Sequence, residues 1–212
     1  MKHSTIQSTS LVALLSSLTG LATAQDYTSS EPFTLQLSSS YSDVDGSFLG
    51  ACHAGAAIEE LCVTGTDGTP AEYNTFALNT SSADASDSDL IYDTGILVWT
   101  LPASNINVSE GLIFPANLAT NVVAPLFEPG SNGADVVGFD DDNLLFIYSN
   151  YVDDKNFTAG VYPAPVEPYP LYQWYACYTY YGAYYYQTLA WVTGGEPNNP
   201  TCEAVNVTRI FI

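Results

Sequence analysis

Residues 169–192, YPLYQWYACYTYYGAYYYQTLAWV, decide the fold class of this chain. The stretch holds nine of the 16 tyrosines and no charged residue. Read with a period of two, Trp174 and Tyr178 fall on one face, which is typical of a strand rather than a helix. Gly182 then offers a turn, and residues 183–192 return along the first strand. Because aromatic side chains suit a pleated, half-buried surface, the stretch predicts an antiparallel β-hairpin.

Short alternating segments continue along the rest of the chain. Residues 33–38 and 204–212 alternate cleanly, and no segment offers about twelve residues of helical periodicity. We expect residues 93–95 to form a hairpin turn and residues 53–60 to form a loop or a single helical turn. The sequence therefore predicts an all-β, single-domain antiparallel β-sandwich, with a closed barrel or a β-trefoil as alternatives.

The N-terminus has the features of a secretory signal. Lys2 precedes a short apolar run at residues 11–21, and Ala-Thr-Ala at 22–24 is a small-residue cleavage site. The alternative is an ordinary buried N-terminal helix. The run is too short to cross a bilayer, and no later run approaches about 18 apolar residues, so no membrane span is expected. We predict a signal peptide at residues 1–24 and one secreted, extracellular domain at 25–212. The Pro-rich run at 162–170 is interpreted as an extended loop rather than a linker between domains.

Acidic residues dominate the charge. The chain has 23 Asp and Glu against three Lys and Arg, and removal of residues 1–24 leaves Lys155 and Arg209 as the cations. Nucleic acids and other polyanions are therefore poor partners. Salt bridges cannot organise such a fold. The many carboxylates repel one another at neutral pH, and this repulsion fades as they begin to protonate at about pH 4. We therefore expect maximal stability at about pH 4–6.

The four cysteines predict two disulfides. An even number of cysteines in an exported chain indicates a disulfide framework, for which three connectivities are possible. Pairing Cys52 with Cys62 and Cys177 with Cys202 is favoured because each bond closes a short local loop.

Four Asn-X-Ser/Thr sequons predict N-glycosylation. They begin at Asn79, Asn107, Asn156 and Asn206, whereas Asn199 is followed by Pro200 and is excluded. Together with the signal peptide, they indicate a eukaryotic secreted glycoprotein.

Several short motifs resemble those of a domain-of-unknown-function family of small secreted proteins from filamentous fungi. In chain order they are GACHAGAAIE at 50–59 with Leu61-Cys62, GFDD at 138–141, WYAC at 174–177, TLAWV at 188–192 and PTC at 200–202. The resemblance covers nearly all of the mature chain and implies a secreted fungal protein of a single domain. It carries over no catalytic or binding residue.

Catalytic and metal-binding signals are weak. His53 is the only histidine after residue 24, no G-x-S-x-G elbow occurs, and Cys52 is expected in a disulfide, so nucleophilic catalysis and a zinc site are disfavoured. Asp140, Asp142 and Asn143 are a weak calcium candidate, against the alternative of a solvated acidic turn. No other metal site, no catalytic residue and no cofactor are expected.

Tyrosines of the hairpin are the strongest candidates for a functional surface. Tyr178, Tyr180, Tyr184 and Tyr186 could form an aromatic platform for sugar rings, although tyrosines in a hairpin also serve as core or cross-strand pairs. We expect a non-catalytic extracellular binding or cell-surface structural domain that contacts cell-wall glycan or another extracellular surface. The alternative is a carboxylate-based glycoside hydrolase, with Glu59, Glu60 or Asp140 as unranked candidates. The oligomeric state is left open.

The secreted protein should begin at Gln25 and carry N-glycans on at least two of the four sequons. N-terminal sequencing and electrophoresis before and after endoglycosidase treatment test this expectation. A sequence that starts at Met1, or a mobility that does not change, would contradict it.

Overall fold

The computed structural model describes residues 27–81, 92–130, 133–149, 152 and 154–212, and this part of the chain is almost entirely β-structure. Every pairing between two named strands is antiparallel, which confirms the predicted all-β fold. Two short 3₁₀ helices, η1 (Glu72–Asn74) and η3 (Asp154–Asn156), interrupt the strands. The strands are β1 (Tyr27–Ser29), β2 (Phe33–Ser38), β3 (Leu49–Gly55), β4 (Ile58–Val63), β5 (Phe76–Ser81), β6 (Asp93–Ala103), β7 (Ile106–Ile113), β8 (Val122–Val123), β9 (Leu126–Pro129), β10 (Val136–Phe139), β11 (Leu145–Ser149), β12 (Tyr169–Leu171), β13 (Trp174–Tyr181), β14 (Tyr184–Val192), β15 (Glu203–Ala204) and β16 (Asn206–Phe211).

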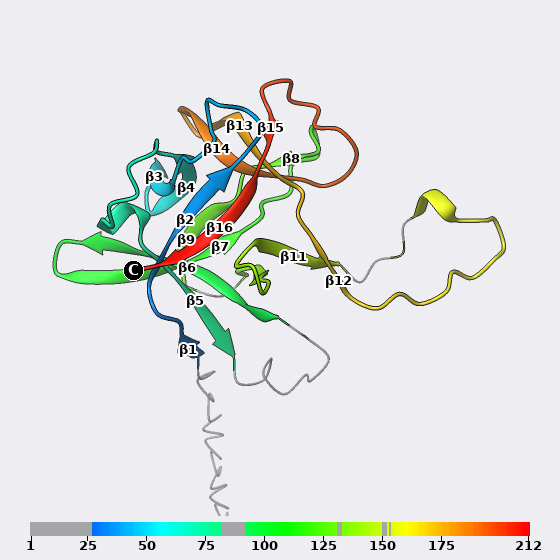
Figure 1. Ribbon diagram of the computed structural model, residues 1–212, viewed down its shortest axis with the longest axis horizontal. Helices are drawn as coiled ribbons and strands as arrows, with labels where there is room; N and C mark the ends of the chain where they lie inside the picture. Colours follow the sequence, from blue (N-terminus) through cyan, green and yellow to red (C-terminus); the bar gives the residue numbers. More distant parts are fainter. Residues whose placement is uncertain (1–26, 82–91, 131–132, 150–151, 153) are drawn as a thin grey trace, which may run out of the picture.

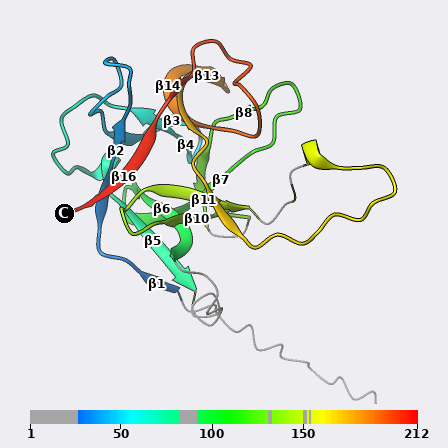
Figure 2. The same cartoon turned by 45° about the vertical axis from the view of Figure 1, so that its right-hand side comes forward.

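All 16 strands belong to one hydrogen-bonded sheet that curls into a half-barrel. Its main path runs β12-β11-β10-β6-β7-β9-β4-β14-β13-β15. The long strand β6 is the branch point, because it pairs with β10 near its start, with β7 near its end and with β5 along its other edge. Figures 1 and 2 show β2 and β16 side by side, and these strands pair over six residues. The curl lets one sheet cover its own apolar face.

A single large cluster of buried side chains fills the inside of the curl. Phe33 of β2, Leu112 of β7, Phe127 of β9 and Trp174 of β13 all belong to it, although they are far apart in the sequence. Complete burial of each such side chain contributes about 1.5–3 kcal/mol. The Trp174 indole N–H donates to the Leu145 carbonyl oxygen at 2.8 Å, so its one polar group is satisfied inside the core.

Two local predictions were wrong. Residues 93–95 are not a turn but part of β6, where Gly95 pairs with Val137. The glycine is needed there because a Cβ atom would collide with the carbonyl oxygen of Asn79 on the neighbouring strand. Residues 53–60 are likewise the ends of β3 and β4 around a tight turn, in which Ala57 has a φ of 54°.

Both predicted disulfides are present. Cys52–Cys62 joins the paired strands β3 and β4, and Cys177–Cys202 ties β13 to the segment that precedes β15. They close loops of 10 and 25 residues, and on the chain-entropy account each contributes about 3 kcal/mol. The second bond fixes residues 193–202 beside the β13–β14 hairpin.

Residues 162–168 of the Pro-rich run lie in the long connection from β11 to β12, whereas Tyr169 and Pro170 belong to β12. Residues 154–168 project away from the body of the molecule in both views, and Tyr162 near their middle is almost fully exposed. The strands on either side of this connection pair with each other, so the loop begins and ends on the same sheet.

Arg209 of β16 ties the C-terminal strand to the other side of the curl. Its Nε donates to Asn143 Oδ1 at 2.9 Å, and its Nη2 lies 3.0 Å from Asp93 Oδ2. The buried guanidinium also lies over the rings of Phe139 and Phe211, 4.5 and 4.9 Å from their centroids. A planar, permanently charged group suits this combination of donors and ring faces.

Replacing this arginine should destabilise the fold more than breaking its ion pair. We expect Arg209→Met to lower the free energy of unfolding by about 2 kcal/mol or more, because the hydrogen bonds and both ring contacts are lost. Asp93→Asn should cost less than about 1 kcal/mol, since the Asp93 side chain is 67% exposed. Unfolding in guanidinium chloride measures the stability of both variants. Equal losses of unfolding free energy would show that the ion pair carries the stabilisation.

Candidate functional site

Exposed tyrosines gather on one face of the β13–β14 hairpin. Residues directly opposite in an antiparallel pair share a face, so the pairs Tyr180–Tyr185 and Tyr178–Gln187 place three tyrosines together. Tyr180 and Tyr185 are 71% and 61% exposed, and the Tyr178 and Tyr185 rings stack with centroids 5.5 Å apart. This face projects beyond the core and is open to solvent.

A groove of about 530 Å³ runs along these tyrosines, and we call it the tyrosine groove. Its second wall is the segment from residue 115 to 124, where the Leu118 side chain is fully exposed. None of the described residues that line the groove is charged. They are Pro115, Ala116, Asn117, Leu118, Thr120, Val122, Val123, Ala124, Tyr178, Thr179, Tyr180, Tyr181, Tyr185 and Asn199.

The groove exists because the second half of β13 extends beyond the hydrophobic core that the first half covers. Trp174 and Ala176 lie on the same face as Tyr178 and Tyr180, but the first two are buried and the last two are exposed. The segment closed by the Cys177–Cys202 bond supports the exposed half, since Tyr178 N–H donates to Thr201 Oγ1 and Asn199 Nδ2 donates to the Tyr178 carbonyl. The tyrosines are therefore exposed but held on a braced strand.

The other two tyrosines of the predicted platform lie elsewhere. Tyr184 and Tyr186 are on the opposite face of the hairpin, half-buried, with their rings stacked at 5.8 Å. Tyr184 also packs edge-on against His53 at 5.2 Å. Sequence reasoning missed Tyr185, although writing out the register around the two-residue turn at Gly182 would have placed it opposite Tyr180.

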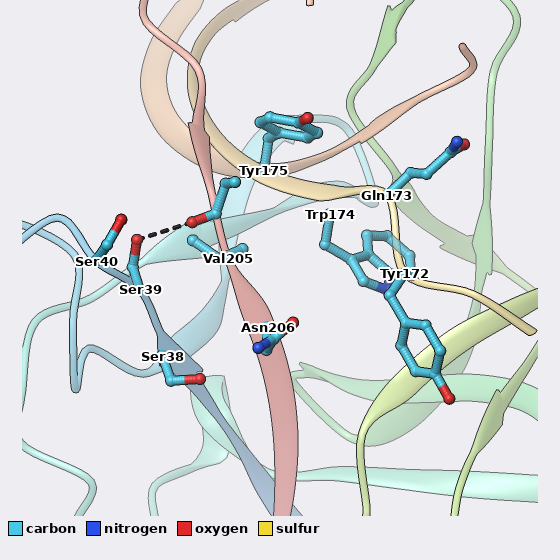
Figure 3. Close-up of a pocket in the computed structure, with 10 residues that line it drawn as sticks. Ser38, Ser39, Ser40, Tyr172, Gln173, Trp174, Tyr175, Val205 and Asn206 are labelled. Carbon is cyan, nitrogen blue, oxygen red and sulfur yellow. Dashed lines mark hydrogen bonds between the residues drawn. The ribbon is translucent and has the colours of Figure 1, made fainter. Parts of the chain in front are cut away.

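A second hollow, shown in Figure 3, is mainly polar. It has a volume of about 460 Å³, and Ser38, Ser39, Ser40, Gln173 and Asn206 contribute to its lining. The Ser39 hydroxyl is already used, because it donates to the Ala204 carbonyl. A glycan attached at the Asn206 sequon would begin in this hollow, which makes it a poorer candidate for an external ligand than the tyrosine groove.

The acidic turn proposed for calcium is engaged in other contacts. Asp140 Oδ1 accepts the backbone N–H groups of Asp142 and Leu144, and its Oδ2 accepts the Tyr172 hydroxyl at 2.7 Å. Asn143 Oδ1 accepts Arg209 Nε. Asp140 and Asn143 therefore already use the side-chain oxygens that they would offer to calcium. Burial and Asp140 together raise the pKa of Tyr172 well above its usual value.

Two carboxyl groups face each other inside the core. Strand β9 lies between β4 and β7, and its Phe127 is opposite Glu59 on one side and Leu112 on the other. Glu110 is two residues before Leu112 in β7 and so lies on the same face of the sheet. Both glutamates are buried, Glu110 completely. If both carboxyl groups were ionised, both Glu110 oxygens and one Glu59 oxygen would have no hydrogen-bond donor. Protonation of Glu110 supplies a donor, and Glu59 accepts it.

Burial, with the contact to Glu59 and the nearby charge of Glu128, raises the pKa of Glu110 to about 8. Arg209 is bound to Asp93 and Asn143, so it does not neutralise the pair. Glu60, on the opposite face of β4, is also fully buried, and burial raises its pKa, although the Thr179 hydroxyl donates to it at 3.1 Å and opposes that effect. The core thus holds carboxyl groups that favour the protonated form.

These positions bear on the hydrolase alternative. A glycoside hydrolase needs two carboxyl groups beside a sugar-binding cleft. Glu59, Glu60 and Asp140 are absent from the lining of the tyrosine groove, and Glu110 is buried within the core. The structure therefore brings Glu59 and Glu110 together, but away from the exposed aromatic surface.

Among the described residues, no group of three or more His, Cys, Asp and Glu is placed to hold a metal ion. In the same part of the chain, no helix has the length and apolar character to cross a membrane.

Residues 30–211 match a domain of unknown function, DUF7907, and the chain belongs to this family. The match covers nearly the whole described chain and supports the resemblance to an uncharacterised domain family. No curated protein and no solved structure matches the chain.

Stability should fall as the pH rises from about 4.5 to about 8. The pKa of Glu110 is raised in the folded state. Its contribution to stability is therefore complete when the pH is below the ordinary pKa of a glutamate, and it is lost as the pH rises through about 8. Glu110→Gln keeps a donor for Glu59 but cannot ionise, so its melting temperature should depend less on pH. The exposed Glu72→Gln is the control. Parallel curves for wild type and Glu110→Gln would contradict the assignment.

Proposed function

We propose that this protein is a secreted fungal glycoprotein that binds a neutral cell-wall glycan, without catalysis, in the tyrosine groove. The observation that carries the proposal is the exposure of Tyr178, Tyr180 and Tyr185 on one face of a braced hairpin. Exposed aromatic side chains that cluster beside an apolar wall are a feature of recognition surfaces rather than of ordinary solvated surface.

The chemistry of the groove suits a sugar ring. Aromatic faces pack against the apolar face of a pyranose, and the tyrosine hydroxyls, the Asn117 amide and the Thr120 hydroxyl can hydrogen-bond its polar edge. The groove itself carries no charge among its described residues, while the whole chain has a net charge of −20. Acidic glycans would be repelled, so the ligand is a neutral polysaccharide.

Other features support an extracellular setting for this function. The N-terminal segment has the composition of a signal peptide, although it lies outside the described residues. Two disulfides are typical of proteins in oxidising compartments. Asn107 and Asn206 are exposed, Asn79 is half-buried, and Asn156 lies in η3, so at least two sequons can carry a glycan without disturbing the core.

Mutation of the groove tests the proposal. An array of cell-wall polysaccharides identifies the best neutral ligand for the secreted protein, and titration then compares the variants. Tyr180→Ala and Tyr185→Ala should each weaken binding about tenfold or more, corresponding to about 1.4 kcal/mol, because an exposed stacking ring is removed without loss of core packing. Tyr162→Ala is the matched control, since this exposed tyrosine belongs to the connection between β11 and β12 and does not line the groove.

Two further readouts separate the alternatives. Affinity should change little between low and high salt, because stacking does not depend on charge. Reducing ends should not accumulate during incubation with the bound polysaccharide, whereas a hydrolase would release them. Absence of binding to every polysaccharide would remove the proposal and leave a structural role on the cell surface.

A further inference from the structure

A third hollow lies on the far side of the segment that walls the tyrosine groove. It has a volume of about 350 Å³, and we call it the Trp191 pocket. Ala116, Asn117, Thr120 and Val123 line both hollows, so residues 116–123 separate them. The remaining lining residues are Phe114, Asp135, Val136, Ile147, Trp191 and Thr193. A cavity of this size accommodates a small molecule.

The three tryptophans differ in what their indole N–H groups contact. Trp99 donates to the Glu72 carbonyl and Trp174 donates to the Leu145 carbonyl, both at 2.8 Å. Trp191 has no hydrogen-bond partner among the described residues, although its side chain is only 8% exposed. Its nitrogen is not fully enclosed, so a water-sized molecule can reach it. A ligand oxygen that replaces such a water keeps the donor paired while the rest of the ligand fills the pocket.

The residues that line the pocket limit the chemistry of a ligand. Phe114, Val123 and Ile147 give the pocket an apolar body. Asp135 contributes a negative charge, and its Oδ2 already accepts the Phe114 N–H. None of the described lining residues is Lys or Arg, so a carboxylate or phosphate ligand would meet repulsion without compensation.

We propose that the Trp191 pocket binds a small uncharged molecule with an apolar body and one carbonyl or ether oxygen, which accepts the Trp191 indole N–H. The apolar body is removed from water by the pocket walls. The oxygen satisfies the one tryptophan donor that the described protein leaves open. This site is separate from the tyrosine groove and does not depend on what the groove binds.

Cyclohexanone and methylenecyclohexane make a matched pair of probes, because the second replaces the ketone oxygen with a CH₂ group of similar shape. Titration of the ¹⁵N-labelled protein follows the three indole N–H signals, and Trp191→Phe identifies the one from Trp191. Cyclohexanone should move that signal downfield and bind about fivefold more tightly than the hydrocarbon. The signals of Trp99 and Trp174 should stay in place, since their donors are occupied.

Two variants complete the test. Trp191→Phe keeps an apolar ring and should bind both probes equally, which isolates the hydrogen bond. Because Trp191 also packs edge-on against Trp174, with ring centroids 4.8 Å apart, a second variant is needed in case the first is misfolded. Val136→Phe fills the pocket from its exposed rim and should abolish binding of both probes. Equal affinities for the two probes in the wild type, or an unmoved Trp191 signal, would overturn the proposal.

Discussion

The shortage of positive charge is the constraint on which this structure depends. With 23 acidic residues and three Lys and Arg, the fold cannot pair the carboxyl groups that its strands bring into the interior. Arg209 is held between the last strand and the Asp93–Asn143 region, so Glu59, Glu60 and Glu110 must be satisfied by shared protons and hydroxyl groups. Acidic conditions favour such an interior, because a buried carboxyl group is tolerated best when it is neutral.

The same curled sheet explains where a ligand can bind. Along β13, one face begins with Trp174 in the core and ends with Tyr180 in solvent, because the strand is longer than the cluster it covers. The Cys177–Cys202 bond and the hydrogen bonds around Tyr178 hold the exposed half in place. Residues 116–123 then divide the adjoining surface into an aromatic groove and the Trp191 pocket. Both proposed sites therefore rely on a rigid strand next to an irregular segment.

Local features were predictable to the extent that local chemistry decides them. The alternation in residues 33–38 and 174–181, the turn at Gly182 and the two short disulfide loops all depend on neighbours along the chain, and the structure contains each of them. The turn expected at residues 93–95 failed because Gly95 serves the close approach of Asn79, a contact between distant segments. The grouping of the tyrosines depended on the register, which placed Tyr185 with Tyr180 and moved Tyr184 and Tyr186 to the other face.

The sequence by itself determined the strand-rich fold and the aromatic character of the hairpin and favoured the local pairing of the cysteines, because periodicity, loop length and composition act over short distances. Only the tertiary structure decided which side chains lose contact with water. It placed Glu110 beside Glu59, left the Trp191 N–H without a partner among the described residues and exposed Tyr180 while burying Trp174. These outcomes depend on how the sheet curls, and burial is a property of the whole assembly of strands rather than of any one segment.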